Sequence, residues 1–269
     1  MNEMDLKKKT VFITGASSGI GKELSRGFAF EGANLVIASL PHEKEILETW
    51  ANELRMRYHI DIWTLTGDLA APGGPEAVYE SVKSMVPHID VLVNNAGIIA
   101  YGDFHERPLE VHERIVAVNL RAYMSLMRLF LPDMIKRKRG HIFNVSSVSA
   151  FVPTPNHAVY GATKAFVQSL SEAVHRELRD TGVKIFTLNP GYTDTPLLKG
   201  ENFPETLWFY KIVGKSDPAT IARQGIDAFK QGKLTFIPGR RLRFLFTVSI
   251  RLTPRRLLNY LSELMLKGV

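Results

Sequence analysis

A short apolar segment, a glycine-rich turn and an amphipathic helix follow one another near the start of the chain and constrain its fold most strongly. Residues 9–14 read Lys-Thr-Val-Phe-Ile-Thr, which is typical of a buried strand, and residues 20–30 have helical apolar spacing. Gly15, Gly19 and Gly21 between them permit a tight turn, a close approach to a pyrophosphate and close packing of helix on sheet. The free N–H groups at such a helix start attract anions. This order predicts the phosphate-binding end of a parallel α/β sheet.

The rest of the chain repeats this alternation of strands and helices. Strand-like runs lie at residues 34–38, 60–65, 90–93, 142–145 and 184–188. The alternation predicts an α/β fold with a doubly wound parallel sheet of the Rossmann type. A chain of 269 residues with 45% hydrophobic content can bury one large core, and no long linker or repeat divides it. We expect a single domain over residues 1–269, with a basic helical extension over residues 239–269.

Tyr160 and Lys164 are the strongest indication of chemistry. On a helix, residues four apart share a face, so both side chains can reach one small volume. The pKa of a free tyrosine is about 10, and a fixed positive charge lowers it, which suits a general acid–base catalyst. Ser147 ends the apolar run 140–147, where open α/β sheets place their ligands. An amphipathic helix alone can produce the tyrosine and lysine spacing, but Ser147 and the glycine turn favour a site.

These residues together resemble the short-chain dehydrogenase/reductase family, over about residues 8–238. The family's T-G-x-x-x-G-x-G signature is matched by Thr14, Gly15, Gly19 and Gly21. Its other motifs are matched, in the family's order, by Asp68-Leu69, by Asn94-Asn95-Ala96-Gly97, by Asn119, and by Pro190-Gly191 followed by Thr195. The resemblance implies a catalytic tetrad of Asn119, Ser147, Tyr160 and Lys164. It implies cofactor binding by Gly15, Ser17, Ser18, Gly19, Ile20, Gly21, Ser39, Asp68, Leu69, Asn95, Ala96, Gly97, Tyr160, Lys164, Pro190, Gly191, Thr193 and Thr195.

The resemblance also implies a reaction, namely hydride transfer between a nicotinamide cofactor and a carbonyl or secondary-alcohol carbon. In that reaction Tyr160 donates the proton, while Lys164 lowers the tyrosine pKa and holds the nicotinamide ribose. Ser147 hydrogen-bonds the substrate oxygen, and Asn119 anchors a water relay to Lys164. The alternative is a regulatory or scaffold protein that binds a dinucleotide without chemistry.

Ser39 predicts the choice of cofactor. Dinucleotide folds that prefer NAD usually end the second strand with Asp or Glu, which binds the ribose 2′-hydroxyl. Neutral Ser39 would not repel a 2′-phosphate, and His42 or Lys44 could reach one. We therefore expect NADP(H) rather than NAD(H), although Leu40 stands where NADP-dependent relatives often carry arginine.

Residues 195–214 are expected to form a lid over the substrate. In the family this stretch covers the active site, and here it is rich in apolar side chains. These are Leu197, Leu198, Phe203, Leu207, Trp208, Phe209, Tyr210, Ile212 and Val213. Such residues can also be core, but beside a cleft they favour an apolar substrate, such as a ketoacyl, steroid-like or other lipid-like molecule.

The net charge of +7 lies at the end of the chain. Residues 233–269 hold eight basic side chains and one acidic one, and the remaining residues are balanced. Leu257, Leu258, Leu261, Leu264 and Met265 share one face of an expected helix. One interpretation is a helix that packs on its own domain or on a partner subunit, with the arginines in solvent. The alternative is peripheral contact with a membrane surface or an acidic substrate carrier.

The remaining expectations concern class and assembly. The chain has no cysteine, no secretory signal pattern and no H-E-x-x-H spacing, so we expect a cytoplasmic protein without a catalytic metal. No nucleic-acid-binding motif is recognisable. A homodimer or homotetramer is expected around the helices near residues 108–131 and 158–179. These helices carry apolar residues on more than one face, including Ile115, Val118, Tyr123, Met127, Phe166 and Leu170.

Overall fold

The computed structural model describes residues 4–199, 203–204 and 207–266, and within them one parallel sheet in the order β3-β2-β1-β4-β5-β6-β7. The strands are β1 (Thr10–Thr14), β2 (Asn34–Ser39), β3 (Ile62–Thr66), β4 (Val91–Asn94), β5 (Gly140–Val145), β6 (Val183–Leu188) and β7 (Thr235–Phe236). The predicted doubly wound sheet is confirmed, and each expected strand segment overlaps an observed strand. The two-residue β7, which pairs with β6, was not expected from the sequence.

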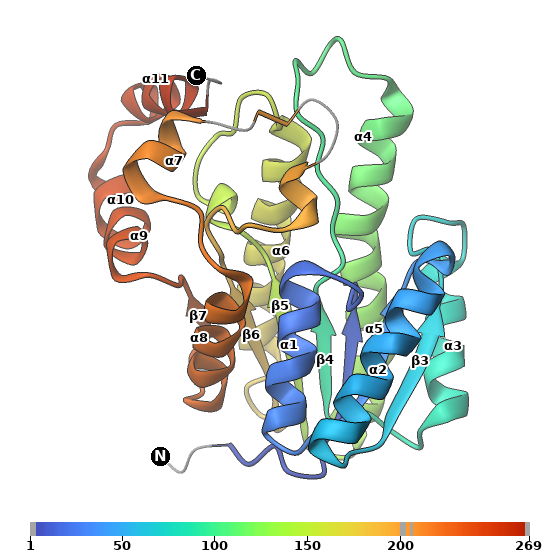
Figure 1. Ribbon diagram of the computed structural model, residues 1–269. Coiled ribbons are helices and arrows are strands. Elements are labelled where there is room, and N and C mark those ends of the chain that lie inside the picture. Colours follow the sequence, from blue (N-terminus) through green and yellow to red (C-terminus); the bar gives the residue numbers. More distant parts are fainter. Residues whose placement is uncertain (1–3, 200–202, 205–206, 267–269) are drawn as a thin grey trace.

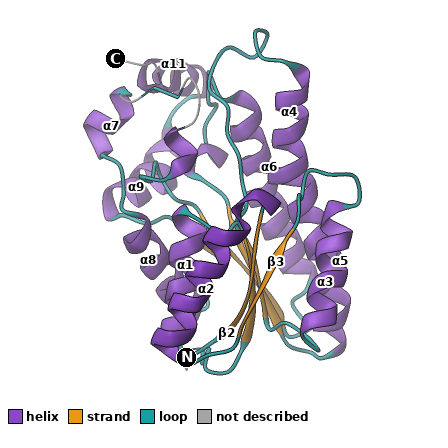
Figure 2. Ribbon diagram, turned by 45° about the vertical axis from the view of Figure 1, so that its right-hand side comes forward, coloured by secondary structure: helices purple, strands orange, loops and turns teal. Residues whose placement is uncertain are grey.

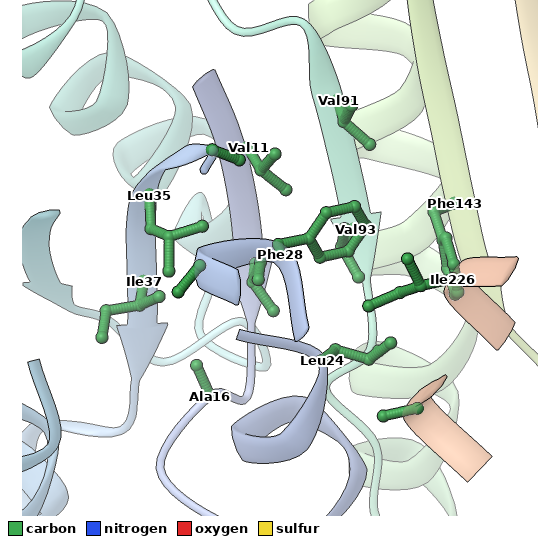
Figure 3. Close-up of a cluster of buried hydrophobic side chains, with 14 of the residues drawn as sticks. Val11, Ala16, Leu24, Phe28, Leu35, Ile37, Val91, Val93, Phe143 and Ile226 are labelled. Carbon is green, nitrogen blue, oxygen red and sulfur yellow. The ribbon is translucent and has the colours of Figure 1, made fainter. Parts of the chain in front are cut away.

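Helices cover both faces of the sheet (Figures 1 and 2). One layer consists of α1 (Gly19–Phe30), α2 (Lys44–Tyr58) and α8 (Pro218–Lys230). The other consists of α3 (Gly74–Met85), α5 (Ala122–Lys136) and α6 (Ala158–Glu177). The period of two along a strand explains the two cores, because Val11 and Ile13 of β1 face the first layer and Phe12 faces the second. Figure 3 shows the first core, where Phe28 of α1 reaches Phe143 of β5, with 6.1 Å between ring centroids.

The helix α4 (Leu109–Val116) continues into α5 through the π-helical turn η2 (Ala117–Arg121). The continuous stretch Leu109–Lys136 is long and apolar enough to cross a membrane by length and composition alone. Here its α5 part packs on the sheet, and Tyr123 and Leu126 are buried in the second core. The core helix of an α/β sheet explains that apolar content.

The carboxyl ends of the strands meet short helical segments that build a third core. The segments η3 (Val148–Ala150), η4 (Pro196–Lys199) and α7 (Trp208–Val213) contribute to this core, whereas η1 (Pro41–Glu43) has no buried residue. The C-terminal extension follows β7 as a continuous helical run, α9 (Arg240–Phe244), η5 (Leu245–Ser249) and α10 (Ile250–Leu252), and then α11 (Arg255–Leu266). Figure 1 shows α11 next to α7 at the upper left, with α10 and α9 below them. The predicted helical extension is therefore present, while its Lys267 lies outside the described residues.

Candidate functional site

The glycine turn lies between β1 and α1 with the geometry that its sequence predicts. Gly15 has a φ of 67°, in the left-handed region that favours glycine. A Cβ on Gly21 would lie 2.1 Å from the Gly15 carbonyl oxygen, so only glycine lets the helix start this close to the turn. The Lys22 N–H donates to the Ser18 carbonyl at 3.1 Å as the first bond of α1. The N–H groups of the preceding residues are therefore available to an anion.

Hydrogen bonds between neighbouring strands fix the floor of the turn. Thr14 Oγ1 accepts from the N–H groups of Asn95 at 3.0 Å and Ala96 at 3.1 Å. The Asn95 amide donates to the Thr14 and Gly15 carbonyls at 2.9 and 3.1 Å. The segment after β4 is thereby tied to the turn after β1. Both segments lie at the carboxyl edge of the sheet, at the reversal of strand order where such folds bind ligands.

The four residues of the expected tetrad converge beside this edge. Ser147 follows β5, and Tyr160 and Lys164 lie one turn apart on α6. A hydrogen bond joins Tyr160 to Ser147, and Lys164 Nζ lies 5.7 Å from the centroid of the Tyr160 ring. Lys164 Nζ also donates to the Val145 carbonyl at 2.9 Å. The two hydroxyl groups and the ammonium therefore share one small, buried volume.

Asn119 lies on the π-helical turn η2, completely buried. Its Oδ1 accepts from the Ile98 N–H at 2.9 Å, and its Nδ2 donates to the Ile98 carbonyl at 2.8 Å. A Cβ on Gly97 would lie 3.5 Å from both Asn119 Oδ1 and Lys164 Nζ. The π-turn thus holds the asparagine next to the lysine, as such turns often do at functional sites.

Burial dominates the electrostatics of the tyrosine and the lysine. It raises the pKa of Tyr160 to about 12, although the hydrogen bond with Ser147 acts to lower that pKa. Burial also lowers the pKa of Lys164 to about 7. The lowering of the tyrosine pKa by Lys164 stays a prediction, because burial is the largest cause of the pKa shift of both groups in this structure. Tyr160 is accordingly protonated at neutral pH.

One cleft of about 330 Å³ runs from the glycine turn to the tyrosine. Every residue expected to bind the cofactor lines it, from Gly15 through Ser39 and Asp68 to Thr195. Ser147 lines it too, whereas Asn119 lies behind its wall. The uncapped turn, the glycines and a long cleft fit a dinucleotide. No cluster of three or more metal-ligating side chains occurs in the described part of the chain.

The cleft contains charged residues that the sequence did not indicate. Glu43, rather than His42 or Lys44, lines the end near Ser39, and its carboxylate accepts from the Leu40 N–H at 3.2 Å. Arg114 of α4 lines the wall and pairs with Asp68 at 3.1 Å. Arg114 could not be identified from spacing, because the pair joins residues far apart in the chain. Glu43 lies only four residues after Ser39, so a tight turn after β2 was the only sequence feature that could have placed it at the cleft.

The end of the cleft at Tyr160, where the family resemblance places the substrate, is largely aromatic and apolar. His157 and Tyr192 line it next to Tyr160, and His157 Nε2 lies 3.4 Å from the Tyr192 hydroxyl. Burial lowers the pKa of His157 to about 4, so this ring is neutral at neutral pH. Tyr101 stacks on His157, with 6.3 Å between ring centroids.

The segment expected to be the lid is divided between cleft and core. Of its side chains, those of Thr195, Pro196, Leu197 and Leu198 line the cleft. Phe203, Leu207 and Phe209 are instead buried in the third core. Trp208 is exposed. Residues 200–202 and 205–206, and the side chains of Ile212 and Val213, lie outside the described part.

The comparisons with known proteins agree with this geometry. Residues 9–205 match the sequence model of a family described as short chain dehydrogenase. An oxidoreductase of Staphylococcus epidermidis is 31% identical over 200 residues, covering 74% of this chain and 84% of that protein. A short-chain dehydrogenase from Sphingobium yanoikuyae, solved in complex with NADPH, is 29% identical, with a TM-score of 0.78 over 91% of each chain. The bulky-bulky ketone specific alcohol dehydrogenase from Comamonas testosteroni is 28% identical, with a TM-score of 0.76 over 91% of this chain and 93% of that one.

Proposed function

Because this chain belongs to the short-chain dehydrogenase/reductase family of oxidoreductases, we propose that it reduces a carbonyl group, or oxidises the corresponding secondary alcohol, of an apolar substrate. The observation that carries the proposal is the hydrogen-bonded pair of Tyr160 and Ser147 beside Lys164, in a cleft that begins at an uncapped, glycine-lined helix. A phosphate-binding turn and a proton donor in one cleft are what a nicotinamide-dependent reaction needs.

The residues of the chain have separate tasks in this proposal. A bound nicotinamide dinucleotide supplies or accepts the hydride. The glycine turn and the start of α1 hold its pyrophosphate, Asp68 and Leu69 its adenine, and Pro190 to Thr195 its carboxamide. Ser147 and Tyr160 donate hydrogen bonds to the substrate oxygen, on which negative charge develops during reduction. Tyr160 then gives its proton to that oxygen.

Lys164 and Asn119 support the tyrosine. Lys164 holds the nicotinamide ribose and supplies positive charge beside the developing anion. Asn119 holds the segment at Ile98 and, through a water relay, returns a proton towards Lys164. The raised pKa of Tyr160 keeps the phenol protonated at neutral pH, so that it can donate a proton to the developing alkoxide.

For the cofactor we propose NADP(H). Support comes from neutral Ser39 at the end of β2 and from the Sphingobium relative, which was solved with NADPH. Glu43 acts against a 2′-phosphate, because its carboxylate lines the same end of the cleft. Titration of the protein with NADPH and NADH tests the proposal, and tighter binding of NADH would overturn it. Glu43→Gln should strengthen NADPH binding relative to NADH in either case.

For the substrate we propose a ketone with large apolar groups, such as a ketoacyl, steroid-like or other lipid-like molecule. Leu197, Leu198 and Tyr192 line the same cleft as Tyr160 and supply apolar surface there. The Comamonas relative is described as specific for bulky-bulky ketones. We propose that residues 195–214 act as the lid over this end, with Phe203 and Phe209 anchoring the segment in the third core.

A screen of ketones of increasing apolar size, followed by loss of reduced nicotinamide absorbance, tests the activity. The account predicts turnover that rises with apolar size. The alternative, a dinucleotide-binding regulatory or scaffold protein, predicts nucleotide binding without turnover of any substrate. A homodimer or homotetramer and a cytoplasmic location stay predictions.

A further inference from the structure

The C-terminal extension has two apolar faces, and its inner face packs on the domain. Leu242 and Phe246 of the first helical run are buried in the third core. Leu258 of α11 is also buried, and Met265 of α11 packs against the third core. The Tyr101 hydroxyl donates to the Leu266 carbonyl at 2.7 Å and ties the end of α11 to the substrate end of the cleft. Part of the apolar face expected from the sequence therefore packs on the chain's own domain, which is the first of the two interpretations given for this helix.

The outer face of the extension is also apolar, and it is exposed. On the first helical run Phe244, Val248 and Leu252 lie four residues apart, and their side chains are 64%, 42% and 80% exposed. On α11 the exposed side chains are Leu257, Tyr260, Leu261 and Leu264. These seven residues, here called the outer face, are nearly half of the sixteen large apolar side chains exposed in the described part of the chain. Such a concentration on two neighbouring helices marks an interaction surface.

The helices that carry the outer face also carry positive charge. Arg240, Arg241, Arg255 and Arg256 are exposed on the same helices. Among the described residues, none of these four side chains forms an ion pair or a hydrogen bond. Arg243 differs, because it donates to the Ile237 carbonyl at 3.1 Å and lies over the Phe236 ring. Four arginines are thus available to an anionic partner.

We propose that the outer face binds the surface of an anionic lipid bilayer, with α9 to α11 lying in the plane of the interface. Apolar side chains flanked by arginines are the composition of interfacial helices. The 12 residues of α11 are too few to span a bilayer, which takes about 20. A second copy of this chain is the poorer occupant, because it would bring two segments of the same strong positive charge together.

The inner face of the extension lies against the cleft. Leu242 of the extension packs against Gly191, which lines the cleft, and Tyr101 joins Leu266 beside His157. The extension therefore lies between a bilayer on its outer face and this end of the cleft. This consequence rests on the proposed function, whereas lipid binding itself does not.

Vesicle co-sedimentation of the full chain without nucleotide or substrate tests the proposal. We expect binding to phosphatidylcholine vesicles that contain phosphatidylglycerol, and little binding to phosphatidylcholine alone. Raising the salt should release the protein, since the screening length falls from about 10 Å at 0.1 M to about 3 Å at 1 M. Equal binding to both vesicles, or no binding at low salt by a folded protein, would overturn the proposal.

Two pairs of variants separate charge from apolar contact. Arg255→Gln with Arg256→Gln should weaken binding at least tenfold, because each basic residue near an anionic surface contributes roughly fivefold. The charge-matched control is Arg57→Gln with Lys83→Gln, two exposed positions outside the extension.

Leu252→Asp with Leu261→Asp should abolish binding, whereas Phe30→Asp with Met56→Asp, also exposed apolar positions, should not. Nucleotide affinity and circular dichroism verify that each variant is folded. If the leucine pair instead dissolves an oligomer in sedimentation and leaves vesicle binding unchanged, the outer face is a subunit interface and the proposal fails.

Discussion

The Tyr160 phenol shows how strongly a buried environment controls an acid. Sequence spacing brings Lys164 near it and suggests a lowered pKa, but both groups lie inside the protein, where the neutral forms are favoured. The pKa of the phenol therefore rises to about 12, and that of the ammonium falls to about 7. The positions of these groups could be predicted from the sequence, but their pKa values depend on packing around them and could not.

The lowered pKa of Lys164 predicts how the free energy of unfolding changes with pH. Below pH 7 its ammonium is charged in both the native and the unfolded state, and the native state bears the full cost of burial. Between about pH 7 and 10.5 the lysine is protonated in the unfolded state but mostly neutral in the native state. The free energy of unfolding of the native protein therefore increases with pH in this range. The variant Lys164→Met does not bear this cost, so it gains nothing from the rise in pH. The free energy of unfolding of the variant minus that of the native protein should therefore fall by about 2 to 3 kcal/mol between pH 6 and pH 9.

Denaturant unfolding at the two pH values measures this change. Lys83→Met, at an exposed lysine on α3, is the control and should show no such trend. A difference between Lys164→Met and the native protein that is independent of pH would contradict the lowered lysine pKa.

At the scale of elements, the turn between β1 and α1 was predictable because its glycines have no steric alternative. A Cβ on Gly21 would lie 2.1 Å from the Gly15 oxygen and 2.3 Å from Asn95 Nδ2. Gly21→Ala must displace the helix start, so we expect nucleotide affinity to fall at least about tenfold and stability to fall by about 1 to 3 kcal/mol. Isothermal titration with NADPH and denaturant unfolding measure the two effects.

Gly73→Ala is the matched control for the turn. Gly73 has a φ of 69°, and no atom lies within 4 Å of its Cβ position. The variant should lose about 1 kcal/mol or more of stability through backbone strain alone. Unchanged NADPH affinity is expected, and an equal loss of affinity in both glycine variants would mean that the turn has no special part in binding.

Other structural features could not be predicted from the sequence. The strand β7 has only two residues, too few for any period to be recognised. The π-turn at Asn119 lies inside one long apolar helix, whose pattern does not reveal a change of hydrogen bonding. The pair of Arg114 and Asp68 joins distant elements, so only the packing of α4 over the cleft brings it together.

At the scale of the whole molecule, the exposed side of the long helix supports the expected assembly. The residues named from the sequence on this helix, Ile115, Val118, Tyr123 and Met127, are buried within the chain itself. Phe166 and Leu170 of α6 are partly buried. A different set is exposed along the long helix, namely Leu109, Val116, Met124 and Ile135. An apolar helix side of this length suits burial against a second copy.

Met124→Glu should therefore shift the oligomer towards monomer in analytical ultracentrifugation, because it would bury a charge at the interface. Met56→Glu, at a methionine of α2 that is 72% exposed, should leave the assembly unchanged. A native protein that sediments only as a monomer at micromolar concentration would contradict the assembly.

If the buried phenol of Tyr160 carries the proton in a nicotinamide-dependent reaction, the variant Tyr160→Phe must lose that reaction. The variant keeps the ring that packs against His157 and removes only the hydroxyl group. We expect turnover of the best ketone to fall by at least about a hundredfold, the range that a general acid contributes. NADPH affinity should stay within about twofold. Near-normal turnover by a variant that binds NADPH normally would contradict the account.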